Sequence, residues 1–410
     1  MCSIKYFLAV NIFMLSGLTA SAQQVAYAIM PGKGISSISS FSEGVAKAKI
    51  GLGKTGFVDN TGKFVVKAIY EDAGSFHDGL AWVSKTIDNN LKYGFIDKTG
   101  TLQIPFLFDE VKDFSFNRAA VKKSGRWQYI DKRGKMVLNS SFVRIDTLID
   151  NMYNGAYNEI KANPTSFHSG LLLVHRGNRY GYADTSGKMI IPPKFYMARD
   201  FSDGVALIVT DTVVSAQMTG NDTLNKMYNK LPPDPATFKW SLIDSTGKVL
   251  CTLDSAKSIK ELGEGLTAFT NGDDYSAIWG IVNKNGKVIL APQFEKQPIG
   301  CSDGVVLVQV DGQSGDNKDG YLLTFDKAGN RIAKIPLCNA GNCINDSNLN
   351  FHEGLLAVKV GRMWGYMDKN GNMAIPPQFD TALDFQNGLA VIVTMDSQVG
   401  AINNPLKEKR

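Results

Sequence analysis

The chain has 410 residues, of which 44% are hydrophobic, 10% aromatic and 20% charged. This length exceeds that of an ordinary single-core domain, so the apolar residues must be divided among several cores or a repeat array. The composition also differs from that of disordered chains. The formal net charge is +5, and no run of about five or six like charges occurs, so neither nucleic acid nor an anionic membrane is indicated as a partner.

The first 22 residues are typical of a secretory signal peptide. Lys5 precedes a mostly apolar stretch from Tyr6 to Leu18, and Ala20-Ser21-Ala22 has the small-x-small pattern of a cleavage site, so we expect the mature chain to begin at Gln23. The apolar stretch is shorter than the about 20 residues that a membrane-spanning helix needs. We therefore expect an exported protein without integral membrane insertion, located in the periplasm, on the cell surface or outside the cell.

A unit of 34 to 38 residues recurs along the rest of the chain. The clearest copy combines Phe351-His-Glu-Gly354, Trp364-Gly365-Tyr366 and Ile375-Pro376-Pro377. We expect one repeat array over residues 23–403 and a short, basic, solvated tail at 404–410. The copies start near Phe41, Phe76, Phe114, Phe167, Phe201, Leu262, Cys301, Phe351 and Phe385.

Each unit predicts a three-stranded antiparallel meander. An Asp-x-x-Gly element, such as Asp368 to Gly371, separates the second strand from the third. This element is typical of a tight turn, in which the carboxylate accepts backbone hydrogen bonds and glycine takes a positive φ. The third strand often contains proline, as at Pro376-Pro377. Proline cannot donate to a ladder, so this strand belongs at an edge or a strand exit.

Four of the five tryptophans occupy one position of the second strand, namely Trp127, Trp240, Trp279 and Trp364. Large and small residues alternate there, which predicts a packed ring next to a small residue that lets a neighbouring ring or backbone approach. We expect these rings to belong to the core. A stacking platform for sugars is the alternative.

This pattern resembles the WG repeat family over most of residues 41–403. The family's dipeptide stands at Trp279-Gly280 and Trp364-Gly365, with variants Tyr93-Gly94 and Tyr180-Gly181. The resemblance implies interaction or surface modules and no defined activity. The first unit has Thr55-Gly56 and the seventh has Leu322-Leu323, so we expect these copies to pack less tightly.

The two ends of the array are complementary. The last copy stops after its second strand, Val399–Asn403, whereas Ala28-Ile29-Met30-Pro31 resembles a third strand that lacks its first two. This predicts an all-β ring like a β-propeller, with one blade shared by both ends. An open array like a β-solenoid is the alternative.

Motif spacing indicates no catalytic residue, cofactor or metal ligand. His77, His168 and His352 share one repeat position where other copies carry Ser, which favours turn chemistry over an active site. His175 lies on an expected strand without a nucleophile motif. Neither a Gly-rich phosphate loop nor a His-Glu-x-x-His zinc motif occurs.

Four cysteines follow the expected signal peptide: Cys251, Cys301, Cys338 and Cys343. Asn and Gly between Cys338 and Cys343 favour a turn that would bring their sulfur atoms together, so we expect a disulfide there. Free thiols are the alternative. The sequence assigns no pairing to Cys251 and Cys301.

Insertions lengthen three units, at about residues 139–166, 211–239 and 331–350. Loops on a rigid scaffold are common places for binding, so Tyr153, Tyr157 and Tyr228 are candidate binding residues; surface decoration is the alternative. We expect an exported, non-catalytic bacterial scaffold that binds a protein, peptide or glycan. A glycan-active hydrolase or lyase on a propeller-like ring is the alternative, because the separation of paired carboxylates is a three-dimensional quantity.

Overall fold

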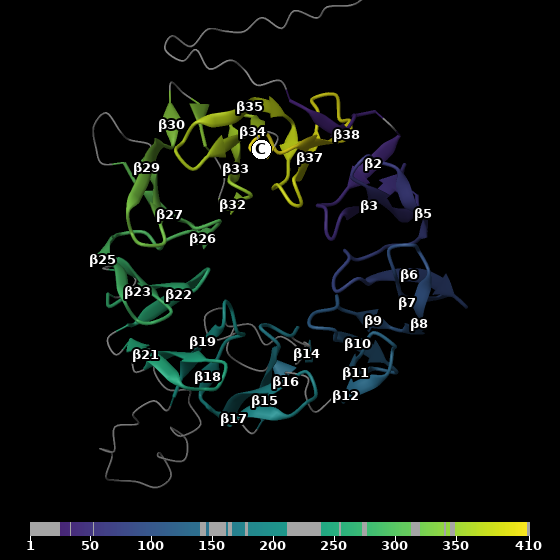
Figure 1. Ribbon diagram of the computed structural model, residues 1–410, viewed down its shortest axis with the longest axis horizontal. Helices are drawn as coiled ribbons and strands as arrows, with labels where there is room; N and C mark the ends of the chain where they lie inside the picture. Colours follow the sequence, from purple (N-terminus) through teal and green to yellow (C-terminus); the bar gives the residue numbers. More distant parts are fainter. Residues whose placement is uncertain are drawn as a thin grey trace, which may run out of the picture.

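The computed structural model describes residues 25–32, 34–51, 53–139, 145–146, 161–162, 166–176, 179–210, 239–253, 256–272, 277–312, 320–339, 342–344 and 349–407. These residues form strands, turns and connections. None of them forms a helix that is long and apolar enough to cross a membrane. Small antiparallel sheets follow one another around a central hole, and both ends of the array meet in one sheet (Figure 1). The protein is a β-propeller, in agreement with the predicted ring.

Nine sheets in the described part form the blades, numbered here in chain order. Blade 1 contains β2 (Ile35–Ile38), β3 (Val45–Ile50), β4 (Thr55–Asp59) and β5 (Phe64–Tyr70). Blade 2 contains β6 (Ala81–Ile87), β7 (Asn90–Ile96) and β8 (Leu102–Phe108). Blade 3 contains β9 (Glu110–Val111), β10 (Ala119–Lys123), β11 (Arg126–Ile130) and β12 (Met136–Leu138).

Blade 4 contains β15 (Leu171–Arg176), β16 (Arg179–Asp184) and β17 (Met189–Phe195). Blade 5 contains β18 (Met197–Ala198), β19 (Val205–Val209), β20 (Trp240–Asp244) and β21 (Val249–Leu253). Blade 6 contains β22 (Ser258–Gly263), β23 (Leu266–Thr270), β24 (Trp279–Asn283) and β25 (Val288–Phe294).

Blade 7 contains β26 (Gly300–Ser302), β27 (Val305–Val310), β28 (Tyr321–Asp326) and β29 (Arg331–Pro336). Blade 8 contains β32 (Phe351–His352), β33 (Leu355–Val360), β34 (Met363–Asp368) and β35 (Met373–Phe379). Blade 9 contains β36 (Thr381–Ala382), β37 (Leu389–Val393), β38 (Val399–Asn403) and β1 (Tyr27–Ile29). Two small hairpins lie outside the blades, β13 (Ile145–Asp146) with β14 (Lys161–Ala162), and β30 (Cys338–Asn339) with β31 (Asn342–Cys343).

Seven of the nine blades have four strands, one more than the sequence pattern predicts. The additional strand precedes the expected meander and faces the hole, as β32 does in blade 8 (Figure 1). It has only two to six residues. A strand this short shows little alternation of polar and apolar residues, which explains why the repeat pattern does not reveal it.

Blade 9 closes the ring with strands from both ends of the chain. The N-terminal strand β1 pairs antiparallel with β38, with Tyr27 opposite Ile402 and Ile29 opposite Ala401. Ile29 is fully buried. The complementary ends inferred from the sequence therefore form one sheet, and the alternative of an open array is excluded.

The glycine of the dipeptide is required by the outer strand of its blade. In blade 8, Trp364 pairs with Phe379 and Tyr366 with Ile375, so three outer-strand residues face Gly365 alone. A Cβ atom on Gly365 would lie 2.6 Å from the carbonyl oxygen of Ile375. The prolines stand in this bulge of the edge strand, where no ladder hydrogen bond is lost.

In blades that lack this glycine, the outer strand pairs with its neighbouring strand in a different way. In blade 7, Leu322, Leu323 and Thr324 pair one to one with Ile335, Lys334 and Ala333. Blade 5 has Ser241 at this position and also pairs without a bulge there, with Ser241 opposite Thr252. Leu322 is fully buried, so the looser packing expected for the seventh unit is not found at this position. In the first unit Gly56 is present, the bulge forms, and Thr55 is fully buried.

The hydrophobic core lies between the blades. Nine apolar clusters occur among the described residues, and each combines side chains of two consecutive blades. The aromatic residues that start the repeats are at most 2% exposed. Several contact a ring of the preceding blade, as Phe385 does Tyr366 at 4.7 Å between ring centroids. Trp127, Trp240 and Trp279 are buried as expected, but Trp364 is only partly buried.

We expect Gly365→Ala to lower the free energy of unfolding by about 1 to 3 kcal/mol, because the new methyl group would overlap the backbone of the bulge. Ser241→Ala is the matched control at the same repeat position, opposite a straight strand, and should cost less than about 1 kcal/mol. Urea titrations followed by circular dichroism measure both. Equal effects of the two substitutions would contradict the proposed role of the glycine.

Candidate functional site

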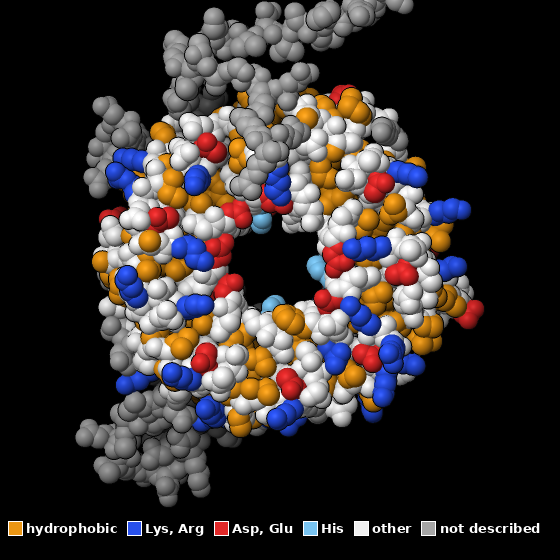
Figure 2. Space-filling view, in the orientation of Figure 1, with side chains coloured by type: hydrophobic (Ala, Val, Ile, Leu, Met, Phe, Trp, Pro, Cys, Tyr) orange, Lys and Arg blue, Asp and Glu red, His pale blue; other side chains and the backbone are white. Residues whose placement is uncertain are grey.

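The wall of the central hole consists of nine tight turns, one from each blade. Each turn leads into the first strand of the predicted meander, and its two central residues have positive φ, as in Glu353 (54°) and Gly354 (84°). We call these central pairs the tips. Acidic and histidine side chains surround the hole (Figure 2). The first tip residues are Glu43, Asp78, Phe116, Ser169, Asp203, Glu264, Asp303, Glu353 and Asn387, and the second tip residue is glycine except at Asn117.

All six acidic tip residues bind the tip of the next blade. Each carboxylate accepts a hydrogen bond from the backbone N–H of the following blade's second tip residue. The pairs are Glu43 with Gly79 (3.2 Å), Asp78 with Asn117 (2.6 Å), Asp203 with Gly265 (3.2 Å), Glu264 with Gly304 (3.1 Å), Asp303 with Gly354 (2.7 Å) and Glu353 with Gly388 (2.9 Å). We call these contacts tip clips.

The closing seam between blades 9 and 1 uses an amide. Asn387 donates from Nδ2 to the carbonyl oxygen of Phe41 at 3.0 Å. Asp or Glu followed by Gly stands two residues after the repeat start in six of the nine copies. This recurrence is visible in the sequence, but the interblade contact is not.

Lysines reinforce three of the tip clips. Lys98 lies 3.1 Å from Glu43, Lys327 lies 3.2 Å from Glu264, and Lys407 lies 3.0 Å from Glu353. Burial acts to raise the pKa of Glu43, but Lys98 and the N–H of Gly79 outweigh it and hold the pKa below its usual value. The Glu43 carboxylate therefore serves as an ionised acceptor that joins blades 1 and 2.

In several blades the residue before the tip also contacts the next blade. Ser42 and Ser115 donate from Oγ to the carbonyl oxygens of Phe76 and Phe167, both at 2.6 Å. Where histidine replaces serine, the partner is an acid immediately before the next aromatic start. His77 Nε2 lies 3.8 Å from Asp113 Oδ2, and His352 Nε2 lies 3.4 Å from Asp384 Oδ2.

The side chains of His77 and His352 contact the next blade, whereas their backbones pair with residues 80 and 355 within their own turns, so a contact across the seam is added to the expected turn role. Burial raises the pKa of Asp113, although His77 and the indole of Trp82 act to lower it. His168 occupies the same position in blade 4, and Asp200 occupies the matching acidic position in blade 5. His175 lies on β15 and stacks on Tyr180 at 4.5 Å, so it is not part of this set.

The two seams that flank blade 4 differ from the others, because their first tip residues carry neither a carboxylate nor an amide. Between blades 3 and 4, the ring of Phe116 lies near Gly170, and Arg118 donates from Nε to the carbonyl oxygen of Thr185 at 2.8 Å. Between blades 4 and 5 the tip residue is Ser169, for which no clip is found in the described part of the chain. Blade 4 is also one of the two blades with three strands.

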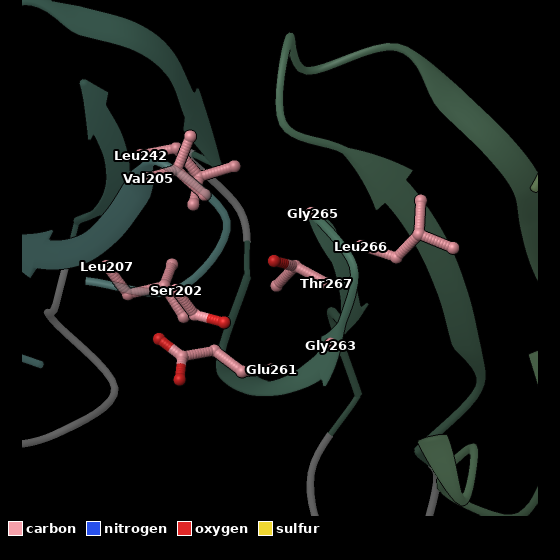
Figure 3. Close-up of a pocket in the computed structure, with 9 residues that line it drawn as sticks. All are labelled: Ser202, Val205, Leu207, Leu242, Glu261, Gly263, Gly265, Leu266 and Thr267. Carbon is pink, nitrogen blue, oxygen red and sulfur yellow. The ribbon is translucent and has the colours of Figure 1, made fainter. Parts of the chain in front are cut away.

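A small cavity lies in the seam between blades 5 and 6 (Figure 3). Ser202, Thr267 and Glu261 are among its lining residues. Its volume is about 10 Å³, about what a single water molecule needs. Burial raises the pKa of Glu261, with Arg199 opposing this shift and Asp200 adding to it. The cavity is too small for an organic ligand.

The structure describes only some of the candidate residues that were chosen from the sequence. The candidate binding residues Tyr153, Tyr157 and Tyr228 lie outside the described residues. Cys338 and Cys343 lie opposite each other in the β30–β31 hairpin, but the side chain of Cys343 is outside the described part. No group of three or more His, Cys, Asp or Glu residues suited to a metal occurs in the part of the chain that the structure describes.

The remaining cysteines are free and unsuited to nucleophilic chemistry. Cys251 is partly buried and Cys301 is buried. Cys301 stands where most copies have phenylalanine, and its sulfur contacts Glu264. Burial, aided by the charge of Glu264, raises the pKa of the Cys301 thiol to about 12. A thiol with this pKa is protonated at neutral pH and is a poor nucleophile.

The first residues of the C-terminal segment pack on the array. Asn404 is 1% exposed and donates from Nδ2 to the carbonyl oxygen of Glu353 at 3.0 Å. The N–H of Asn404 donates to Gly388 O at 2.9 Å. Together with the ion pair of Lys407, these contacts place residues 404–407 on the tips of blades 8 and 9.

Comparison with known proteins identifies the family. The sequence profile of the family described as WG containing repeat matches residues 56–86, 93–127, 180–211, 279–313 and 364–394. The chain belongs to the WG-repeat family. All five matches begin at the glycine that faces the bulged outer strand or one residue before it. The Trp-Gly dipeptide and its variants therefore mark the bulged blades of this WG-repeat propeller. Among curated proteins, no sequence match is found.

Solved structures with similar arrangements are distant in sequence. A structure titled as the eukaryotic initiation factor is 10% identical, with a TM-score of 0.52, covering 85% of this chain and 91% of that chain. BamB from Moraxella catarrhalis is 10% identical, with a TM-score of 0.36, covering 79% and 89%. The computationally designed Ika8 protein is 12% identical, with a TM-score of 0.36, covering 94% and 98%. The first of these likenesses shows a shared fold alone.

We expect Glu43→Gln to lower the free energy of unfolding by about 1 kcal/mol at pH 7, a value that allows for partial exposure of the pair. Folding lowers the pKa of Glu43, so its stabilisation exists above the unfolded-state pKa and is lost as the pH falls through the folded-state pKa. The difference from wild type should therefore shrink as the pH falls below the ordinary glutamate pKa of 4.5 and through the lowered folded-state pKa. Denaturant titrations at several pH values measure this, with Ser169→Ala as the control. A difference that does not shrink as the pH falls would refute the ionic tip clip.

Proposed function

We propose that this WG-repeat propeller is an exported, non-catalytic scaffold that binds a protein, peptide or glycan in the bacterial envelope or outside the cell. The observation that carries the proposal is the use of the acidic tip residues. All six tip carboxylates accept a backbone N–H from the neighbouring blade. Groups that are engaged in this way hold the wall of the hole and are poorly suited to proton transfer.

The carboxylates of the Asp-x-x-Gly turns have the same structural character. Asp184 Oδ1 accepts from the N–H groups of Ser186 and Lys188 at 2.9 and 3.0 Å. Its pKa is lowered, first by the hydroxyl of Ser186. An acid catalyst at neutral pH would need a raised pKa, so these turns do not supply one. Loops that differ between otherwise similar blades are the natural place for recognition on such a scaffold.

The alternative function, a glycan-active hydrolase or lyase, is favoured by one pair of neighbouring acids. Asp200 acts to raise the pKa of Glu261 in the seam between blades 5 and 6. Glycosidases use a pair of carboxyl groups, one of which acts as an acid with a raised pKa. The small volume of the adjacent cavity weighs against this alternative, because a sugar ring would not enter it. A screen of hydrolase and lyase substrates separates the two functions.

Export and an oxidised hairpin are parts of the same proposal. Ile344 donates its N–H to the carbonyl oxygen of Leu337 at 2.7 Å, one residue pair beyond Cys338 and Cys343. The two cysteines therefore occupy a non-hydrogen-bonded position of the ladder, where Cα atoms are about 4.5 Å apart. Disulfides usually join Cα atoms about 4.4 to 6.8 Å apart, so the backbone geometry supports a bond in an oxidising compartment.

We expect protein purified from the periplasm or medium to begin at or near Gln23 and to lose about two mass units relative to its reduced form. Intact-mass spectrometry and N-terminal sequencing measure both properties. Cys338→Ser removes the mass difference, whereas Cys251→Ser is the control that retains it. Two free thiols at Cys338 and Cys343 would argue against the bond, and an uncleaved cytosolic protein would argue against export.

We expect variants in which a short Gly-containing turn replaces insertion 139–166 or 211–239 to keep β-rich circular dichroism and cooperative melting, because the blades hold themselves together. Binding of envelope or extracellular partners should weaken several-fold, measured by pull-down from envelope extracts. Met136→Gln, a change of an exposed outer-strand residue, is the control that keeps every partner. If both replacements also keep every partner, the insertions are not the binding surface.

A further inference from the structure

We propose that residues 404–407 form a strap that takes the place of the outer turn in the shared blade and holds the ring closed. This inference is independent of the proposed binding function, because it concerns how the two ends of the array are held together. Blades 1 to 8 each have an Asp-x-x-Gly or Asn-x-x-Gly turn between their last two strands. Blade 9 has no such turn between β38 and β1, because these strands come from opposite ends of the array.

In two other blades a lysine of this turn holds the tip of the preceding blade. Lys98 directly follows the turn aspartate of blade 2. Its Nζ atom donates to the carbonyl oxygen of Glu43 at 2.8 Å and lies 3.1 Å from the Glu43 carboxylate. Lys327 has the same turn position in blade 7 and lies 3.2 Å from the carboxylate of Glu264. The turn that blade 9 lacks is therefore also a source of contacts between blades.

The strap supplies the same two contacts to Glu353, the acidic tip residue of blade 8. Asn404 donates from Nδ2 to the carbonyl oxygen of Glu353 at 3.0 Å. Lys407 Nζ lies 3.0 Å from Glu353 Oε2. Asn404 follows the last residue of β38 just as Lys98 follows the turn aspartate of blade 2. The two contacts that Lys98 makes alone are thus divided between two residues of the strap.

Local hydrogen bonds shape the strap as a turn. The N–H of Lys407 donates to the carbonyl oxygen of Asn404 at 3.1 Å, and the N–H of Leu406 donates to Asn404 Oδ1 at 2.9 Å. Asn at the first position and Pro405 at the second are typical of such a turn. The conformation of the strap therefore follows from its own sequence and needs no strand after it.

The strap joins the end of β38 to the tips of both blades at this seam. The N–H of Asn404 donates to the carbonyl oxygen of Gly388, in the tip of blade 9, at 2.9 Å. Leu406 lies against the tip of blade 8, where its Cδ1 atom would be 3.0 Å from a Cβ atom on Gly354. The tip clip between Glu353 and the N–H of Gly388 joins the same two tips. The strap and this clip therefore support one another.

The shared blade needs this support because strand ends without a connecting turn open easily. β1 has only three residues, Tyr27–Ile29. At the side where the turn would stand, the N–H of Asn403 donates to the carbonyl oxygen of Ala26 at 2.9 Å. The strap begins at the next residue, so it holds β38 in place at the point where its pairing with β1 ends. We expect release of the strap to loosen the shared blade before the other blades.

Hydrogen–deuterium exchange followed by mass spectrometry tests the proposal on two shortened variants. The variant that ends at residue 403 has no strap, and the variant that ends at residue 407 keeps it and is the control. We expect amides of β1 and of the blade 9 tip to exchange about tenfold faster in the first variant, whereas those of blade 3 keep their wild-type rates. The control should exchange like wild type throughout, and both variants should keep β-rich circular dichroism.

Two single substitutions test the same contacts if the shorter variant does not fold. Lys407→Gln removes the ion pair to Glu353 and should speed exchange at Gly388 several-fold. Lys98→Gln removes the matching ion pair at the first seam and should speed exchange at Gly79 but not at Gly388. Unchanged exchange at Gly388 in Lys407→Gln would overturn the proposal. Equal acceleration at Gly388 by Lys98→Gln would also overturn it, because the effect would then be a general loss of stability.

Discussion

Every blade of this protein depends on its neighbours to bury its faces. A sheet of three or four short strands has two broad faces and cannot cover either one by itself. The nine apolar clusters of the described residues all lie between consecutive blades. An open stack would leave two faces exposed at its ends. Sharing blade 9 between β1 and β38 removes both exposed faces and closes the ring.

The outer rim depends on the close approach of two strands at the glycine of the repeat. A side chain at Gly181 would meet the carbonyl oxygen of Ile191 at 2.5 Å, so the bulged outer strand and the glycine require each other. The bulge places prolines on the exposed edge, which limits pairing with other chains. Blade 7 has neither the glycine nor the bulge. Leu323 stands in place of the glycine, and the outer strand pairs there without a bulge. The family dipeptide is thus a local packing requirement.

The inner wall is held by polar contacts, because the strands there are short. Carboxylates at the tips satisfy N–H groups of the next blade, and serines or histidines form a second set of contacts beside them. Two sets of interblade contacts keep the hole open without filling it (Figure 2). These contacts also engage carboxylates and histidines that would be candidates for catalysis if they had no such partners. Blade 4 departs from this scheme at both of its seams, and the exposed ring of Phe116 stands at one of them.

The sequence by itself determined the repeat, the all-β class, the turns and the closure, because each follows from local chemistry. Asp-x-x-Gly marks a turn wherever it occurs, and the incomplete units at the two ends complement each other. The short inner strands escaped prediction because two to six residues carry little periodicity. The sequence located the histidines at one repeat position but not their partners. His77 and Asp113 are separated by a whole blade in the chain and meet only when the ring forms.

The same reason explains why the tip residues went unrecognised. Nothing within Ser42-Glu43-Gly44 shows that the carboxylate will reach Gly79, since that distance is set by the stacking of two blades. Exposure of Phe116 likewise depends on where its turn lies in the ring. Local sequence fixes backbone conformation and the pattern of burial within a blade. Contacts across seams, and therefore the chemistry of the central hole, are decided by the tertiary arrangement.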